Sequence, residues 1–309
     1  MNDTFMKTRP VFPLLLSMAL PNVISMLVNS LYNIVDSLFV AQISEQAMTA
    51  LSLVFPIQNF VNAVAIGFGI GINAQIALYL GAGDHENANR AATHGMMFSL
   101  LHGVLGMVLC IAIMPGFLRR FTTDPTLVDM GVTYSTIVFL FSLVNMADLA
   151  FEKIFQSVGR MNVAMVALIT GCVTNIALDP VLIFGLGPVP ALGIAGAAWA
   201  TVIAQAASFC MSVLFFTRFS CQQFRGVRAD RATVGRILTL GLPTLVQMGS
   251  LSVVLVVMNG LLAPRAGTVG VAAFGYVSRL AEFALAPFSA LCLAAAPIIG
   301  SSYGAGLHS

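Results

Sequence analysis

Long apolar stretches alternate with short polar ones along almost the whole chain. Four stretches carry no Asp, Glu, Lys or Arg, and they cover 46–83, 91–118, 180–217 and 237–264. About 20 apolar residues in a helix cross the hydrocarbon core of a membrane, so each stretch is long enough to do so. Polar residues inside the stretches recur at steps of three and four, which predicts helices with one polar face. The pattern therefore predicts an all-α integral membrane protein built as a multi-helix bundle.

Eight helices follow from this pattern, with boundaries set by turn residues. Gly81-Ala82-Gly83-Asp84 is expected to end the second helix, and Asp124-Pro125 to precede the fourth. The predicted spans are 12–40, 48–80, 92–114, 130–151, 162–185, 193–217, 236–262 and 270–302.

Composition supports a membrane protein and excludes two other classes. Hydrophobic residues make up 58% of the 309 residues and charged residues only 8%, too few to cover a soluble protein of this length. A net charge of +2 gives no support to a nucleic-acid partner. The five cysteines are an odd number scattered along the chain, which indicates free thiols.

Loop charges indicate how the helices are oriented. With the N-terminus in the cytoplasm, ten Lys and Arg side chains fall on cytoplasmic loops, and three (Arg119, Arg120 and Arg265) fall outside. Cytoplasmic loops are enriched in these residues. The apolar segment after Lys7 and Arg9 is too long for a signal peptide. We therefore expect a multi-pass protein of the cytoplasmic (inner) membrane with its N-terminus inside.

Two short motifs recur at nearly one spacing. Residues 16–21 (LSMALP) resemble residues 238–243 (LTLGLP), and residues 81–83 (GAG) recur at 304–306. Transporters are often built from such internal repeats, although small-residue motifs also match by chance. We expect a six-helix lobe at 1–217, a cytoplasmic linker at 218–235, and the first two helices of a repeated second lobe at 236–309. On this interpretation the second lobe is incomplete and the chain is truncated after helix eight.

Two carboxylates within apolar helices, Asp36 and Asp179, are the strongest functional signal. A charged side chain inside a bilayer costs several kcal/mol and rarely persists without a use. Their helices also carry polar side chains at helical spacing, so these residues share a face with the acids. Spans and helix rise place the acids and Thr201 at a similar depth. The expected cation-coupling residues are Asp36, Asn175, Asp179 and Thr201, and Asn29, Asn33 and Gln205 are weaker cavity or gating candidates.

Such a cluster has two chemistries open to it. Carboxylate, amide and hydroxyl oxygens suit a hard cation such as Na⁺. Two nearby carboxylates in a low dielectric also favour retention of a proton by one of them. The competing interpretation, that polar stripes only join helices by hydrogen bonds, fits Gln205 better than the two acids. The sequence leaves H⁺ and Na⁺ open as the coupling ion and predicts no other metal and no cofactor.

Three further residues have two interpretations each. Pro21 and Pro180 kink the helices that carry the acids, and ion loading could shift those bends. Prolines are also ordinary in membrane helices. Asp148, near the end of the fourth predicted helix with Asn145 on the same face, is either a gate or an interfacial residue.

Together these motifs resemble the multidrug and toxic compound extrusion (MATE) family, over essentially the whole chain. The family implies two six-helix lobes that export cationic or amphipathic compounds by alternating access, against an inward flux of H⁺ or Na⁺. It also implies a cation site at the residues matching Asp36, Asn175, Asp179 and Thr201. The resemblance rests on Pro21 with Asp36, Gly81-Ala82-Gly83-Asp84, residues 175–185 (NIALDPVLIFG), and residues 193–201 (GIAGAAWAT) followed by Gln205.

One position departs from the family pattern and indicates which branch of the family the chain resembles. Some branches carry a glutamate shortly after Gly241-Leu242-Pro243, where this chain has Gln247, so it is closer to the branch that couples through its N-terminal lobe. The implied partners are small-molecule substrates and membrane lipid, with a monomer as the expected state.

Three other functions are alternatives to export. A lipid-linked oligosaccharide flippase of the same superfamily would need basic residues for its anionic substrate. A membrane enzyme would need a nucleophile or metal motif, and none is found in the sequence. An inactive membrane fragment is the third alternative.

Overall fold

The computed structural model of the chain describes residues 6, 10–186, 189–219, 224 and 231–307. Helices build the described part of the chain, which contains no strand, so the all-α prediction is confirmed. Most of the predicted linker, 218–235, lies outside the described residues. The helices are α2 (Val11–Ile43), α3 (Glu45–Gly81), α4 (His85–Phe121), α5 (Pro125–Leu140), α6 (Ser142–Ser157), α7 (Met161–Phe184), α8 (Ile194–Phe219) and α9 (Arg231–Gly304).

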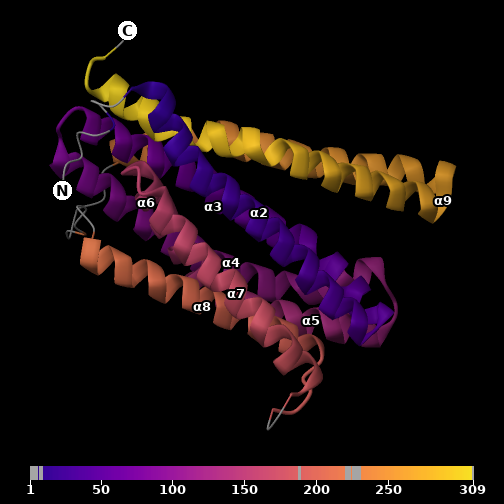
Figure 1. Ribbon diagram of the computed structural model, residues 1–309. Coiled ribbons are helices and arrows are strands. Elements are labelled where there is room, and N and C mark those ends of the chain that lie inside the picture. The colour runs from indigo at the N-terminus through magenta and orange to yellow at the C-terminus, as the bar shows by residue number, and fades with distance from the viewer. Residues whose placement is uncertain (1–5, 7–9, 187–188, 220–223, 225–230, 308–309) are drawn as a thin grey trace.

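Two capped turns mark the two ends of the bundle. Between α2 and α3, Ser44 Oγ accepts a hydrogen bond from Ala47 N (3.0 Å), and we name this the Ser44 end. Between α3 and α4, Asp84 Oδ1 accepts one from Asn87 N (3.0 Å), which marks the Asp84 end. These caps satisfy backbone donors that the first helical turn leaves free. From α2 to α8 the chain passes back and forth between the two ends, with α5 and α6 together making one pass, so segments distant in sequence lie at similar heights (Figure 1).

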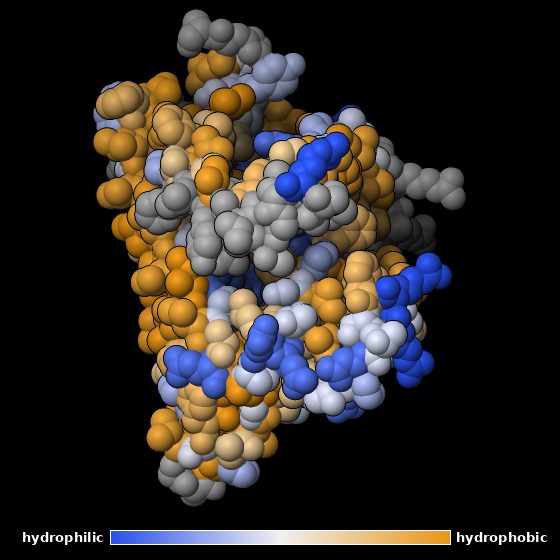
Figure 2. Space-filling model, turned by 90° about the vertical axis from the view of Figure 1, so that its right-hand side faces the viewer, coloured by the Kyte–Doolittle hydropathy of each residue, from blue (hydrophilic) through white to orange (hydrophobic). Residues whose placement is uncertain are grey.

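The helices are long and apolar enough for a multi-pass membrane protein. Among the described residues, α2, α3, α4, α7, α8 and the segment Ala284–Gly304 of α9 are long and apolar enough to cross a membrane, which makes six spans, or seven if α5 and α6 form one bent span. Large apolar side chains such as Phe12 and Leu101 are exposed, as expected of a surface that faces lipid. Orange, hydrophobic residues cover much of the face drawn in Figure 2, and blue residues form separate patches. Predicted spans one to three, five and six correspond to α2, α3, α4, α7 and α8.

The fourth predicted helix, 130–151, is wrong as a single element. It consists of α5 and α6, which meet at Phe141 with a bend of 51°. Ser142 Oγ donates a hydrogen bond to Gly103 O on α4 (2.6 Å). A Cβ at Gly103 would lie 2.8 Å from Leu143 Cα, so this glycine lets the start of α6 pack against α4. A tertiary contact therefore fixes the break, without a proline at the bend.

The seventh and eighth predicted helices form one helical run, α9, so the loop expected at 263–269 is wrong. Proline in a membrane helix bends the chain without necessarily ending the helix, and α9 continues through Pro264. The run nevertheless reverses its direction. Gly67 on α3 contacts Gly241 and Leu245, whereas Ala77, further along α3, contacts Gly300. Figure 1 accordingly shows α9 leaving the Asp84 end and returning to it.

Glycine contacts join α3 to both arms of α9 at the Asp84 end. A Cβ at Gly71 would overlap Ile237 O, and one at Gly304 would overlap Leu78 O. Backbones this close require residues without side chains at the crossing point, a common arrangement in membrane helix packing. Away from this end α9 diverges from the other helices (Figure 1). The division of the chain into 1–217, 218–235 and 236–309 stays a prediction.

Candidate cation site

The four residues expected to couple a cation come from three helices that pack side by side. Asp36 lies on α2, Asn175 and Asp179 lie on α7, and Thr201 lies on α8; α7 packs against both α2 and α8. Asp179 is fully buried, Asn175 is 1% exposed and Thr201 is 7% exposed. Asp36 is partly buried. The geometry therefore brings together two carboxylates, an amide and a hydroxyl towards the Ser44 end.

An amide connects two of these helices. In the orientation that suits its neighbours, Asn175 Nδ2 donates to Asp179 Oδ2 (2.9 Å) and its oxygen accepts from Thr201 N (3.2 Å). Thr201 Oγ1 donates to Ala197 O (3.0 Å), which leaves its lone pairs free to accept or to coordinate. Asn175 thus fixes the height of Asp179 on α7 relative to Thr201 on α8.

The two carboxyl groups face each other with incomplete hydrogen bonding. Asp36 and Asp179 lie within hydrogen-bonding reach of one another. Oδ1 of each is buried and has no hydrogen-bond partner in the described part of the protein. Two adjacent carboxylates in a low dielectric cannot both stay charged without compensation. This pair can therefore bind a proton or a cation between its oxygens.

Two tyrosines complete the surroundings of the acids, and sequence reasoning missed both. Tyr32 interacts electrostatically with Asp36, Asp179 and Tyr134. Tyr134 is 4% exposed, and its hydroxyl lies within reach of the Gln58 and Thr201 side chains. Tyr32 precedes Asp36 by one helical turn, so its spacing was a usable signal. Tyr134 carried no such signal, because α5 and α2 lie about 100 residues apart in sequence.

The weaker candidates occupy different surroundings. Asn29 and Asn33 are exposed on α2, and Asn33 Nδ2 donates to Asn29 O within that helix (2.9 Å). Pro21 is buried inside α2, more than three turns from Asp36, and Pro180 adjoins Asp179 inside α7. Neither asparagine therefore bonds to the acid pair in this arrangement.

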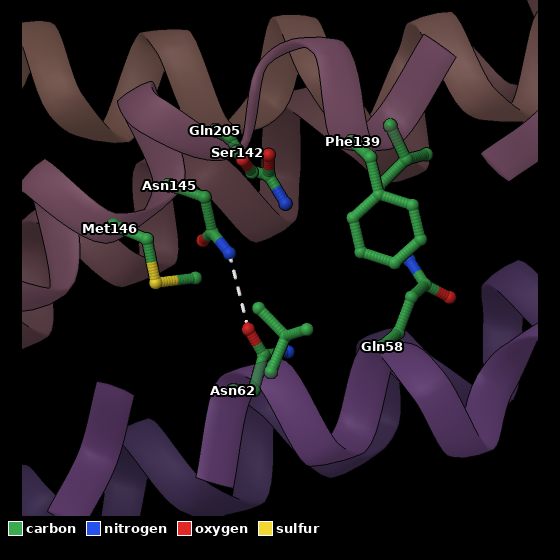
Figure 3. A pocket seen from close by; sticks show the side chains of 9 residues that line it. Gln58, Asn62, Phe139, Ser142, Asn145, Met146 and Gln205 are labelled. Atoms are coloured by element: carbon green, nitrogen blue, oxygen red, sulfur yellow. Dashed lines mark hydrogen bonds between the residues drawn. The ribbon is translucent and has the colours of Figure 1, made fainter. Parts of the chain in front are cut away.

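Gln205 lines a small pocket beside the bend between α5 and α6. Its Oε1 is buried and has no hydrogen-bond partner among the residues described. The pocket has a volume of about 30 Å³, room for one or two water molecules. Figure 3 shows the amides of Gln58, Asn62 and Asn145 around the same space, with Asn145 Nδ2 donating to Asn62 Oδ1 (3.2 Å).

The donor atoms at the acid pair are oxygens, the ligands that Na⁺ and other hard cations prefer. The described residues contain no group of three or more His, Cys, Asp or Glu side chains able to hold a metal. The described cysteines, Cys110, Cys172, Cys210 and Cys292, are free thiols.

Comparison with known proteins assigns the chain to a family. The MatE family model matches residues 21–181. The multidrug export protein MepA of Staphylococcus aureus is 24% identical over 97% of this chain and 66% of its own length. The probable multidrug resistance protein YoeA of Bacillus subtilis is 28% identical over 84% of this chain and 57% of its own length.

The fold resembles that of a solved transporter structure. A MOP-superfamily transporter from Pyrococcus furiosus, described as having a binding pocket of reverse polarity, superimposes with a TM-score of 0.92. It is 25% identical and covers 99% of this chain, which spans 68% of that structure. The chain belongs to the MatE family, the multidrug and toxic compound extrusion transporters.

Proposed function

We propose that this chain carries the ion-coupling part of an exporter of cationic or amphipathic small molecules, driven by inward movement of H⁺ or Na⁺. The observation that carries the proposal is the pair of Asp36 and Asp179, each with a buried oxygen that has no hydrogen-bond partner among the described residues. Intramembrane acids of this kind mark ion pathways. The chain's relatives MepA, a multidrug export protein, and YoeA, a probable multidrug resistance protein, support an export function.

Alternating access would link the acid pair to substrate movement. Loading of the pair neutralises a buried charge between α2 and α7 and so changes the free energy of their contact. Pro21 and Pro180 place potential bends in those two helices. We propose that this local change biases the protein between an outward-open and an inward-open state. The oxygen donors serve H⁺ and Na⁺ equally, so the proposal names both.

The proposed topology places the Asp84 end in the cytoplasm and the Ser44 end outside. More of the described lysines and arginines lie towards the Asp84 end (Arg90, Lys153, Arg160, Arg218 and Arg236) than away from it (Arg119, Arg120 and Arg265), which supports this topology. On this topology α9 begins a second lobe whose contact with α3 lies on the cytoplasmic side. The protein acts as a monomer in the cytoplasmic membrane, with lipid and small-molecule substrates as its partners and no enzymatic step.

Charge favours this function over a flippase for anionic lipid-linked sugars. α2, α3 and α7 contain no lysine or arginine. The charged side chains at the acid pair are therefore negative, which attracts cations and repels anionic head groups. An anionic substrate would lack a basic partner on these helices.

Transport assays test the proposal directly. Everted membrane vesicles containing the protein are energised first with a pH gradient and then with a Na⁺ gradient, and ethidium accumulation is followed by fluorescence. Asp36→Asn and Asp179→Asn are expected to lower gradient-driven uptake at least tenfold, with normal membrane insertion. Asp129→Asn, an exposed acid on α5, is the matched control and should transport normally. Unchanged uptake in both site variants would reject the site.

A further inference from the structure

A third carboxylate inside the bundle, the partly buried Asp148 on α6, lies towards the Asp84 end and away from the acid pair. Ser208 Oγ donates to its Oδ2 (2.6 Å), and Ser212 Oγ donates to its Oδ1 (2.7 Å). Both serines lie on α8 and are almost fully buried, at 6% and 2% exposed. Two hydroxyls from one helix therefore hold a carboxylate from another.

One stripe of α8 connects this carboxylate with the acid pair. Thr201, Gln205, Ser208 and Ser212 follow at steps of four, three and four residues, which places them on one helix face. The seven residues from Thr201 to Ser208 correspond to a rise of about 10 Å. A short polar route along α8 thus leads from the cation site to Asp148.

The amide-lined pocket occupies the middle of this route. Gln58, which lies within reach of Tyr134, lines it on one side, and Asn145 and Gln205 line it on the other (Figure 3). Asn145 precedes Asp148 by one turn on α6, and Gln205 precedes Ser208 by one turn on α8. The buried Gln205 Oε1 can accept a hydrogen bond from a water in the pocket. Amides and one or two waters can thus bridge the distance between the two sites.

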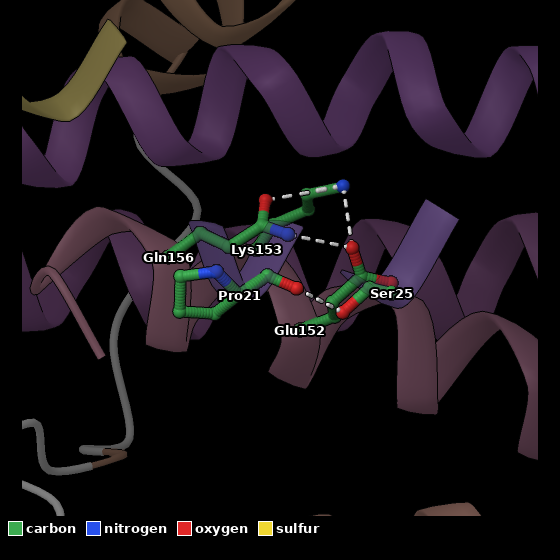
Figure 4. A network of polar contacts seen from close by, with 5 residues as sticks. All are labelled: Pro21, Ser25, Glu152, Lys153 and Gln156. Carbon is green, nitrogen blue, oxygen red and sulfur yellow. Dashed lines mark hydrogen bonds and ion pairs between the residues drawn. The ribbon is translucent and has the colours of Figure 1, made fainter. Parts of the chain in front are cut away.

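Beyond Asp148 the route continues to a partly exposed carboxylate, Glu152. Glu152 lies one turn further along α6, its side chain is 24% exposed, and its charge acts on Asp148. Lys153 Nζ donates to Glu152 Oε1 (2.8 Å) and to Gln156 Oε1 (3.2 Å), as Figure 4 shows. The stem of Lys153 fills the space that Gly69 leaves on α3. This network fixes Glu152 between Asp148 and the Asp84 end.

Other described titratable side chains lie on the helices packed against α6. On α4, His94 Nδ1 contacts Arg90 O (2.8 Å) and His102 Nε2 contacts Val61 O (3.1 Å). On α3, the hydroxyl of Tyr79 is in contact with Gln75 Nε2 (3.2 Å). Cys172 on α7 is buried, and Cys210 on α8 is exposed. Among the described charged side chains, Glu152 is the one that acts electrostatically on Asp148.

We propose that Asp148 is a second proton-binding site, which takes the coupling proton from the acid pair and passes it towards Glu152. This inference rests on the proposed ion coupling, with H⁺ as the ion. In the step, the O–H bond of the protonated acid pair breaks and an O–H bond forms on Asp148, and the proton passes along water molecules that the pocket amides hold by hydrogen bonds. Ser208 and Ser212 stay hydrogen-bonded to the neutral carboxyl group, because one hydroxyl can donate to its carbonyl oxygen and the other can accept from its new O–H bond. No electron transfer is involved.

Infrared difference spectroscopy tests this step without a transport assay. The purified protein in lipid is titrated with acid while the carbonyl stretch of protonated carboxyl groups is recorded. One component should be absent in Asp148→Asn, yet present in the Asp36→Asn/Asp179→Asn double variant and in the Asp129→Asn control. A spectrum of Asp148→Asn identical to that of the unsubstituted protein at every pH would overturn the inference.

A second variant guards against loss of the band through misfolding. Ser208→Ala/Ser212→Ala keeps Asp148 but removes both hydroxyl donors, so the band assigned to Asp148 should persist at a shifted frequency. An unshifted band would show that it does not belong to Asp148 and would also overturn the inference.

Transport then separates the two proposals. Asp148→Asn is expected to reduce pH-driven ethidium uptake at least tenfold. Normal uptake in Asp148→Asn, with loss in Asp36→Asn and Asp179→Asn, would reject the second site and leave the proposed function standing. Normal uptake in all three variants would reject both.

Discussion

Asp36, Asp179 and Asp148 are all carboxylates inside one bundle, but their oxygen atoms are hydrogen-bonded differently. Asp148 has both oxygens bonded to serine hydroxyls. Asp36 and Asp179 face each other, and each keeps one buried oxygen without a partner in the described residues. Buried charges are normally stabilised by hydrogen bonds or by an opposite charge. Side chains of the bundle therefore supply the hydrogen bonds that Asp148 needs, whereas the acid pair needs a bound proton or cation.

The largest stability effect expected from this comparison is at Asp148. Asp148→Ala removes two hydrogen bonds to a charged group and leaves a small void, so we expect a loss of about 2 kcal/mol in the free energy of unfolding. Thermal unfolding in detergent, followed by the fluorescence of Trp199, the single tryptophan, measures it. Asp148→Asn keeps an acceptor for one serine and should lose less. Equal stability of both variants and the unsubstituted protein would mean that the serine bonds contribute nothing.

The opposite sign is expected at the acid pair. Asp179→Asn removes one of two facing carboxylates, so the repulsion and the desolvation of a charge both fall. We expect stability in the absence of added cation to stay the same or to rise by about 1 kcal/mol. The same fluorescence assay compares it with Asp148→Asn. A clear loss in Asp179→Asn would show that the acid pair is a structural element and would remove the contrast.

Much of the fold could be predicted from the sequence, because apolar length and helical spacing are local properties. The spans of α2, α3, α4, α7 and α8 needed only runs of about 20 apolar residues. The Asp124 and Asp84 caps were visible as turn residues at helix starts. The bend at Phe141 was not predictable, because Gly103 and Ser142 produce it across 39 residues of sequence.

The candidate site shows the same limit. Asp36 and Asp179 could be singled out because acids are rare in apolar helices. Asn175 could be placed beside Asp179 by helical spacing alone. The role of Ser208 and Ser212 could not, since the sequence showed a polar stripe on α8 without its partner on α6. Asp148 was interpreted as a gate or an interfacial residue, and its two serine bonds are visible only once α6 and α8 are packed together.

The smallest effect on stability is expected at Asp84, a carboxylate in the turn between α3 and α4 that accepts two hydrogen bonds. Asn87 N donates to its Oδ1 (3.0 Å) and Asn87 Nδ2 donates to its Oδ2 (2.6 Å), and these bonds lower the pKa of Asp84. A lowered pKa in the folded state adds stability above the ordinary value of about 3.9, and this contribution is lost as the pH falls through the folded value.

Asp84→Ala should therefore lower stability by about 1 kcal/mol at neutral pH, and the difference should shrink below pH of about 4. Asp84→Asn keeps a capping oxygen for Asn87 N but has no charge to lose, so its stability should equal that of the unsubstituted protein at neutral pH without the acid-dependent change. Thermal unfolding at a series of pH values measures all three proteins. If Asp84→Ala lowered the stability as much as Asp148→Ala, the position of Asp148 inside the bundle would not explain the larger loss expected there.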